Sequence, residues 1–312
     1  MGSLHLDASN DDAFAPPPGA PPLLSDDQII SLATQGHLLL PLSPELTAAY
    51  ENLFRVASDF FAHPDATKST LYPNSGTVEL GYTRVVNEKE YLTLGNASHP
   101  ETDLERLATH VWHDTGALLQ RVMADLARGL ALPEPSQIWD PLLDGCLDLP
   151  NSKADATPTI LRIFQYAPNS GLAEKHTDIG LLTLCVTQGS GLQVLTREAA
   201  EWVWRDVQGP TLLIGTALRT LVGNRMRAGV HQVVANPQGR RSAIFALRPS
   251  LRHQCDLGRF GGGVKLGVQK FWEEIKSNRY NINAPKDMRD LQKQNLKMKE
   301  KPSPRVTDDT GF

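Results

Sequence analysis

The stretch His176-Thr-Asp-Ile-Gly-Leu-Leu-Thr-Leu-Cys-Val186 carries the strongest structural signal in this chain of 312 residues. Its second half, from Leu181 to Val186, has the apolar composition of a β-strand. In an extended segment the side chains at positions i and i+2 point the same way, so His176 and Asp178 should face one side, about 7 Å apart along the strand. At that spacing both side chains can bind one ion.

A His-x-Asp pair alone is a weak signal, because the chain contains three of them. Only the third is flanked by strand-like segments, 159–166 and 181–186, which would hold its side chains still. The other two lie in a polar leader and at the end of a helical pattern, namely His5/Asp7 and His63/Asp65.

A second histidine, His231, follows 53 residues after Asp178. Two imidazoles and one carboxylate on one face of a metal leave the opposite face open, which suits a non-heme Fe(II) centre that binds a substrate and dioxygen. Arg240 and Ser242 supply a forked cation and a hydroxyl, which suit a dicarboxylate co-substrate. On a strand these two side chains would point the same way and Arg241 the other. The alternative for Arg240 is a surface ion pair.

Composition favours an ordinary globular protein, with 40% hydrophobic and 21% charged residues and a net charge of −4. No strongly basic patch points to nucleic acid. No apolar run approaches the roughly 18 residues of a membrane span, and no signal peptide is visible. We therefore expect a cytoplasmic protein that binds a small molecule, with no nucleic-acid or membrane partner. The sequence gives no indication of the oligomeric state.

The order of patterns predicts four regions. Residues 1–24 form a flexible Pro-rich leader, 25–150 an N-terminal helical extension, 151–280 the catalytic core, and 281–312 a C-terminal helical tail. In the tail, four cations fall on one helical face, which we expect to be solvated: Lys286, Arg289, Lys293 and Lys297.

Short apolar runs separated by turn residues begin near 158 and predict an antiparallel jelly roll. Its eight expected strands are 159–166, 181–186, 192–195, 202–206, 211–214, 218–222, 231–235 and 241–247. Non-local pairing in such a roll can bring residue 231 to residues 176 and 178.

Together, His176-Thr-Asp178, Gly191-Leu-Gln-Val194, His231 and Arg240-Arg-Ser242 resemble the Fe(II)/2-oxoglutarate-dependent dioxygenases, in the branch of isopenicillin N synthase and anthocyanidin synthase. The resemblance covers roughly 36–275. It implies a mainly β fold, with a double-stranded β-helix (jelly-roll, cupin-like) core and N-terminal and C-terminal helical extensions.

The resemblance also implies roles for individual residues. His176, Asp178 and His231 would hold Fe(II), and 2-oxoglutarate would chelate the iron. Its far carboxylate would bind Arg240 and Ser242, with Tyr166 as a further hydrogen-bond donor. Phe164 stands where the family has Asn, and a short interval before Arg240 leaves open whether Arg240 or Arg241 binds the carboxylate.

The activity implied by the resemblance is oxidation of a small molecule with O2, by hydroxylation or related ferryl chemistry, with succinate and CO2 as co-products. Several candidate substrate residues are cationic, which suggests an acidic intermediate of secondary metabolism. These candidates are Arg162, Lys175, Arg219, Arg248 and Phe271. Two alternatives stay open: an iron-dependent oxidase of the isopenicillin N synthase type that does not use 2-oxoglutarate, and a non-catalytic small-molecule receptor on the same fold.

Overall fold

Antiparallel pairing arranges the core of the molecule into two sheets. The computed structural model describes residues 21–74 and 79–300, the last three by their backbone alone. Within these ranges the larger sheet has the strand order β1-β9-β6-β11-β4-β3-β2, and the smaller sheet has the order β5-β10-β7-β8. The larger sheet contains β1 (His37–Leu39), β2 (Gly81–Val85), β3 (Lys89–Leu94), β4 (Ile160–Tyr166), β6 (Leu182–Gln188), β9 (Thr211–Ile214) and β11 (Arg240–Leu247). The smaller contains β5 (Ala173–His176), β7 (Leu192–Glu198), β8 (Glu201–Asp206) and β10 (His231–Val233).

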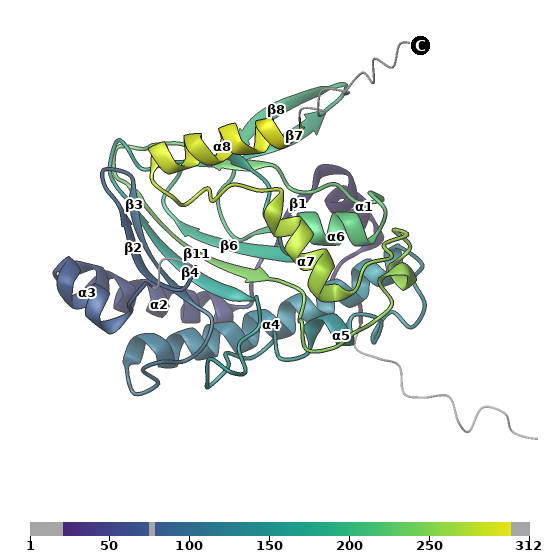
Figure 1. Ribbon diagram of the computed structural model, residues 1–312, viewed down its shortest axis with the longest axis horizontal. Coiled ribbons are helices and arrows are strands. Elements are labelled where there is room, and N and C mark those ends of the chain that lie inside the picture. Colours follow the sequence, from purple (N-terminus) through teal and green to yellow (C-terminus); the bar gives the residue numbers. More distant parts are fainter. Residues whose placement is uncertain (1–20, 75–78, 301–312) are drawn as a thin grey trace, which may run out of the picture.

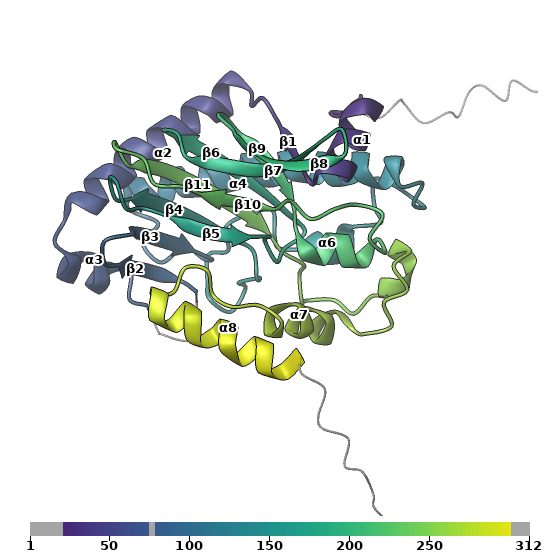
Figure 2. The same cartoon turned by 90° about the horizontal axis from the view of Figure 1, so that it is seen from above.

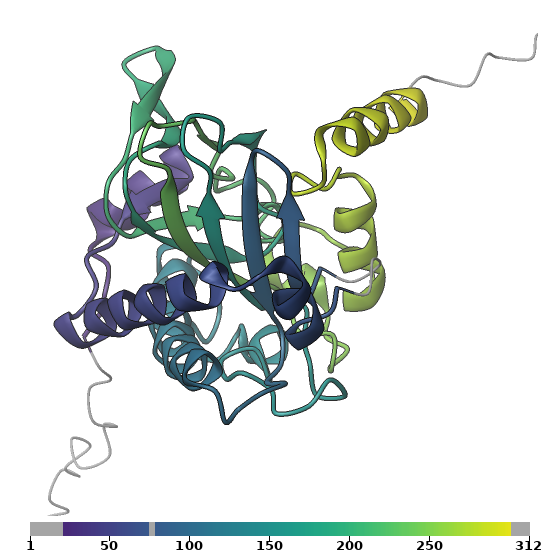
Figure 3. The ribbon, with the colours of Figure 1, turned by 90° about the vertical axis from the view of Figure 1, so that its left-hand side faces the viewer.

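The two faces of the larger sheet are buried by different partners. On one face, Trp112 of α4 (Asp103–Gly129) packs edge-on against Phe245 of β11, with ring centroids 5.1 Å apart. Helix α2 (Pro44–Ala62) packs against α4 on the same face, and the smaller sheet covers the other face (Figure 2 and Figure 3). Ser43 caps α2 by accepting a hydrogen bond from Leu46 N at 3.2 Å. The expected jelly-roll core with flanking helices is confirmed.

The remaining helices surround this core (Figure 1). None of the helices in the described ranges is long and apolar enough to cross a bilayer. Besides α2 and α4, the described helices are α1 (Asp26–Gln35), α3 (Asp65–Leu71), α5 (Asp140–Leu143), α6 (Thr216–Leu221), α7 (Val268–Ser277) and α8 (Lys286–Glu300), with a 3-10 turn at Leu257–Phe260.

Two sequence-based assignments of strands and helices need correction. The segment 218–222 was expected to be a strand, but it belongs to α6 and the turn after it. Its apolar residues Leu218, Leu221 and Val222 also fit helical spacing, and a short apolar run does not distinguish the two. The strand that completes the roll is β5. The region 25–150, expected to be a helical extension, also supplies the β2–β3 hairpin to the larger sheet. Its strand β1 falls in the segment 36–42, which is strand-like in sequence.

Both ends of the described chain are more firmly attached than the sequence suggests. The flexible leader was expected to span residues 1–24. Residues 1–20, which include the His5/Asp7 pair, lie outside the described residues. Leu24 is buried, however, and the backbone N–H groups of Leu23 and Leu24 each donate to Asp125 Oδ2 at 2.8 Å. The chain is therefore already fixed before α1 begins.

The prediction that the cationic face of α8 is solvated is wrong at Arg289, which is only 1% exposed. Arg289 Nη1 and Nη2 each donate to a carboxylate oxygen of Glu88 at 2.9 Å, and Nε donates to Glu174 Oε1 at 3.2 Å. Lys293 also pairs with Glu174. Lys286 and Lys297 are exposed, as expected. These ion pairs attach α8 to the β2–β3 turn and to β5.

Candidate metal centre and ligand cavity

Two neighbouring strands of the smaller sheet bring the histidines together. His176 ends β5 and His231 begins β10, and the two residues are paired in the antiparallel register. Their ring centroids lie 4.1 Å apart. Asp178 Oδ1 lies 3.7 Å from His176 Nε2 and 4.0 Å from His231 Nε2. Donor atoms of all three side chains therefore lie within 4.8 Å of one another.

Backbone carbonyls orient both imidazoles. His176 Nδ1 lies 2.7 Å from Glu174 O, and His231 Nδ1 lies 3.1 Å from Gly229 O. Because a carbonyl oxygen only accepts, each Nδ1 carries the proton and each Nε2 keeps a free lone pair. This arrangement is common for histidines that bind a metal.

The protonation states also suit a cation. Burial, and then the neighbouring His231, lower the pKa of His176 well below its usual range, so its imidazole is neutral near pH 7. Burial is the largest influence on Asp178 and opposes its ionisation, but the combined effect of His231, His176, Thr183 and Arg248 lowers its pKa. Asp178 Oδ2 is buried and makes no hydrogen bond within the described residues. A buried carboxylate oxygen without a partner destabilises the fold unless a cation or a hydrogen-bond donor binds it. These three residues therefore fit a divalent metal.

Close backbone packing holds the loop that carries Asp178. Thr216 N, at the start of α6, donates to Asp178 O at 2.8 Å. Gly215 lies so close to this loop that a Cβ would stand 2.0 Å from Gly180 O. Any larger residue at 215 would therefore push the Asp178 loop away. Thr216 also contacts Thr177 through their hydroxyls at 3.2 Å.

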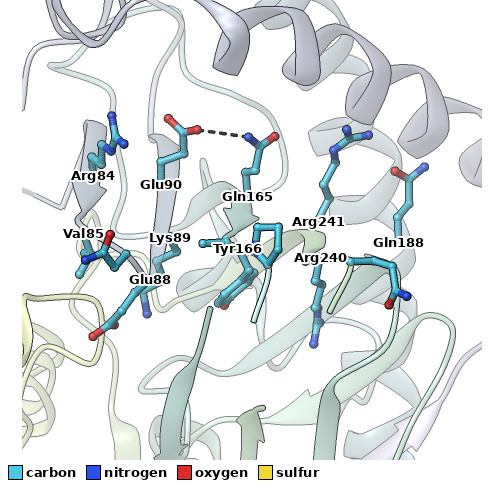
Figure 4. Close-up of a pocket in the computed structure, with 15 residues that line it drawn as sticks. Arg84, Val85, Glu88, Lys89, Glu90, Gln165, Tyr166, Gln188, Arg240 and Arg241 are labelled. Carbon is cyan, nitrogen blue, oxygen red and sulfur yellow. Dashed lines mark hydrogen bonds between the residues drawn. The ribbon is translucent and has the colours of Figure 1, made fainter. Parts of the chain in front are cut away.

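Arg240 and Tyr166 are paired across β11 and β4 and line the same cavity as the three metal-binding candidates. Arg240 is only 5% exposed, and its Nε and Nη1 have no hydrogen-bond partner in the described part of the chain. Arg241 is exposed and points to the opposite side of the sheet (Figure 4). The sequence did not decide between Arg240 and Arg241 as the residue that binds the carboxylate. In the structure, Arg240 is the one that faces the cavity. Ser242 faces the cavity beside it.

The cavity has a volume of about 280 Å³. Of the five substrate candidates, Arg162, Lys175 and Arg248 line it. Arg219 does not, because it is exposed on α6 and donates from Nε to Asn224 Oδ1 at 2.8 Å. Phe271 does not either, because it is buried in the apolar core on α7.

Sequence reasoning missed several residues of the cavity. Glu79 Oε2 lies 2.7 Å from Arg248 Nη1, and the charge of Arg248 lowers the pKa of Glu79 to about 2. The segment after α7 also lines the cavity through Arg279 and Tyr280. No local motif marks these positions, because they reach the cavity only through the tertiary fold.

Comparisons with known proteins agree with this geometry. No protein-family model matches the chain. The 2-oxoglutarate-dependent dioxygenase frbH of Dothideomycetidae sp. (strain 11243) is 34% identical over 104 residues, which cover 33% of this chain and 32% of that protein. The 2-oxoglutarate-dependent dioxygenase iboH of Amanita muscaria is 34% identical over 122 residues, covering 34% of this chain and 59% of that protein. The matched segments thus span from about a third to about three-fifths of these relatives.

Two solved structures share the fold over most of their length. A full-length Neurospora crassa protein in complex with alpha-KG and thymine has a TM-score of 0.62 at 18% sequence identity, covering 81% of this chain and 91% of that one. A Caulobacter crescentus protein of the 2OG-Fe(II) oxygenase family has a TM-score of 0.63 at 20% identity, covering 80% and 91%. The resemblance to 2-oxoglutarate-dependent dioxygenases is confirmed. The narrower branch of isopenicillin N synthase and anthocyanidin synthase is not singled out by these matches.

Proposed function

We propose that the protein is a non-heme Fe(II)- and 2-oxoglutarate-dependent oxygenase that oxidises a small acidic molecule. One observation carries the proposal: the two histidine Nε2 atoms and the Asp178 carboxylate converge in the same cavity as a buried, incompletely bonded arginine, Arg240. Two imidazoles and one carboxylate are the ligands of non-heme Fe(II) oxygenases, and they leave open positions on the metal.

His176, Asp178 and His231 would hold the metal. Fe(II), when bound, would supply the activation of dioxygen that amino-acid side chains cannot provide. The chain's own contribution is to keep both Nε2 atoms unprotonated and the carboxylate ionised, as the Nδ1 hydrogen bonds and the lowered pKa values of His176 and Asp178 favour.

Arg240, Ser242 and Tyr166 would bind the far carboxylate of 2-oxoglutarate. A guanidinium with free Nε and Nη1 can bind a carboxylate through two parallel hydrogen bonds. Burial raises the pKa of Tyr166, which keeps its hydroxyl protonated and able to donate. The Neurospora crassa protein was solved with alpha-KG, another name for 2-oxoglutarate, and this supports the same co-substrate here. Decarboxylation of 2-oxoglutarate would yield succinate and CO2.

The charge of the cavity supports an acidic primary substrate. Among the residues that the structure describes, six lysine and arginine side chains line the cavity but only two carboxylates do. The charges of Fe(II) and of the 2-oxoglutarate dianion cancel, so the excess of positive charge in the cavity remains after both have bound. Such an excess concentrates anions in a low-dielectric pocket. The frbH and iboH matches, both from fungi, favour a substrate from secondary metabolism.

Stoichiometry tests the proposal. Purified protein loaded with Fe(II) and supplied with 2-oxoglutarate, without ascorbate, should form one succinate for each O2 consumed, at a rate that acidic metabolite fractions increase. O2 consumption without succinate would instead identify an oxidase that does not use the keto acid. Absence of any O2 consumption with iron bound would favour the receptor alternative.

A further inference from the structure

The inner face of the larger sheet has cations at both ends and an apolar centre. Alternate residues of β4 and β11 face the cavity, so Tyr166 and Arg240 mark one end of this face and Arg162 lies toward the other. Arg162 and Tyr166 are four residues apart on one strand, or about 13 Å at the usual rise of about 3.3 Å per residue. Phe164, which is paired with Ser242, lies between them, and Ile244 is paired with Arg162.

Arg248, just after β11, joins Arg162 at this second end. Glu79 Oε2 lies 2.7 Å from Arg248 Nη1 but 3.8 Å from Arg162 Nη2, so it hydrogen-bonds to Arg248 alone. Two guanidiniums thus share one carboxylate. Arg162 is only 5% exposed and Arg248 only 9%, so the uncompensated positive charge lies largely out of water.

The hydrogen bonds at this end are also incomplete. Arg162 uses Nε to donate to Thr93 Oγ1 at 2.7 Å, which leaves its forked end directed toward Glu79. Arg248 Nη1 donates to Glu79 and, at 3.2 Å, to Pro158 O. Arg248 Nε is buried and has no partner among residues 21–74 and 79–297. A purely structural ion cluster would pay for desolvation without satisfying its donors, whereas a second anion would satisfy both the charge and the hydrogen bonds.

We propose that Arg162 and Arg248 form the receptor for a carboxylate of the primary substrate, and that Glu79 is its internal competitor. The inference rests on the proposed function, because the Arg240 end of the cavity is assigned to the co-substrate. The substrate would then be an amphipathic carboxylic acid. Its carboxylate binds Arg162 and Arg248, and its carbon skeleton lies along Phe164 and Ile244.

A matched pair of probes tests this receptor. 4-Phenylbutanoate carries a carboxylate on an apolar skeleton, and its methyl ester lacks the charge. Their binding to the full-length protein can be measured by calorimetry with Mn(II) and saturating 2-oxoglutarate, so that the Arg240 end is already occupied. The acid should bind at least tenfold more tightly than the ester.

Three substitutions and one control locate the carboxylate. Arg162→Gln and Arg248→Gln should each weaken binding of the acid at least tenfold and leave the ester unchanged. Glu79→Gln should strengthen binding of the acid several-fold, because it removes the competing anion. Arg219→Gln, on the exposed side of α6, should have no effect. An unchanged Kd for 2-oxoglutarate in each variant shows that the protein is folded.

Several outcomes would overturn the receptor: equal affinity for acid and ester, no binding of the acid by the wild type at millimolar concentration, or less than twofold change in both arginine variants. Glu79→Gln alone provides an independent check, since weaker binding of the acid would contradict competition. Failure of the oxygenase assignment is distinguishable, because it would appear as loss of 2-oxoglutarate binding in the wild type.

Discussion

His176 and His231 face each other as a register pair on adjacent antiparallel strands, with their ring centroids 4.1 Å apart. The 53-residue separation of His231 from Asp178 is therefore bridged by one strand pairing, β5 with β10. Since a shift of one residue in that pairing would turn a side chain to the other face of the sheet, the strand register is the feature that assembles the candidate metal centre.

Asp178→Asn should lower Fe(II) affinity by roughly 100-fold or more, because it replaces an ionised ligand with a neutral one in the same volume. Asp206→Asn is a suitable control, since Asp206 is exposed at the end of β8 and away from the cavity. Metal content after anaerobic equilibration with Fe(II) measures the effect. Equal iron content in Asp178→Asn and wild type would contradict the assignment.

Arg240→Gln should raise the KM for 2-oxoglutarate by about 10- to 100-fold, as expected when a charge-assisted hydrogen-bonded pair worth about 1.5–3 kcal/mol is lost. Arg240→Lys should recover only part of this loss, because lysine lacks the planar fork. The neighbouring Arg241→Gln should leave the KM unchanged, since Arg241 is exposed on the opposite face. Steady-state kinetics at fixed Fe(II) compares the three variants, and a larger effect at Arg241 would reverse the assignment.

Arg289→Gln should destabilise the protein by about 3 kcal/mol, because it leaves the largely buried Glu88 carboxylate without its cation. Lys286→Gln removes only the exposed pair with Asp290 and should cost less than about 1 kcal/mol. Urea unfolding gives both values. Since the segment before α8 lines the cavity, Arg289→Gln should also weaken substrate binding. A stability loss no larger than that of Lys286→Gln would show that α8 is not anchored in this way.

Stability should also rise with pH through Lys89. Burial lowers the pKa of Lys89 to about 7, whereas an unfolded chain holds this proton up to a pKa of about 10.4. Between these values the unfolded state binds more protons, so the group adds up to about 1.4 kcal/mol of stability per pH unit as pH increases. Below pH 7 both states are protonated and the full cost of burying the charge remains.

Lys89→Met should remove this contribution, and the exposed Lys153→Met should retain it. Urea unfolding at pH 7.5, 8.5 and 9.5 measures the slope. Parallel slopes for Lys89→Met and wild type would show that the Lys89 ammonium is not desolvated.

Local patterns predicted the parts of the site that lie within single strands. Arg240 and Ser242 are two residues apart within β11, and strand geometry alone predicts that both face one side. His176 ends β5, but Asp178 lies in the loop that follows it, so contacts of this loop with the start of α6 also place the Asp178 side chain. The apolar run at 218–222 satisfied strand and helix spacing equally, and Gly215 packing against Gly180 places that segment at the start of a helix. Glu79 and Arg279 could not be found locally, because each reaches the cavity through contacts with residues far away in sequence.

The burial of Arg289 also escaped prediction for a physical reason. Helical periodicity places Arg289 on a cationic face, but the residues that neutralise it, Glu88 and Glu174, come from the β2–β3 turn and from β5. The β2–β3 hairpin itself was missed inside a region with strong helical patterns. The pattern of charges within α8 therefore could not reveal the partners of Arg289.

The most direct test of the central claim is the visible spectrum of the protein with Fe(II) and 2-oxoglutarate in the absence of oxygen. Chelation of the metal by the keto acid beside His176, Asp178 and His231 should give a weak charge-transfer band that is lost in His176→Ala. A folded wild-type protein without the band, or a His176→Ala variant that keeps it, would contradict the account.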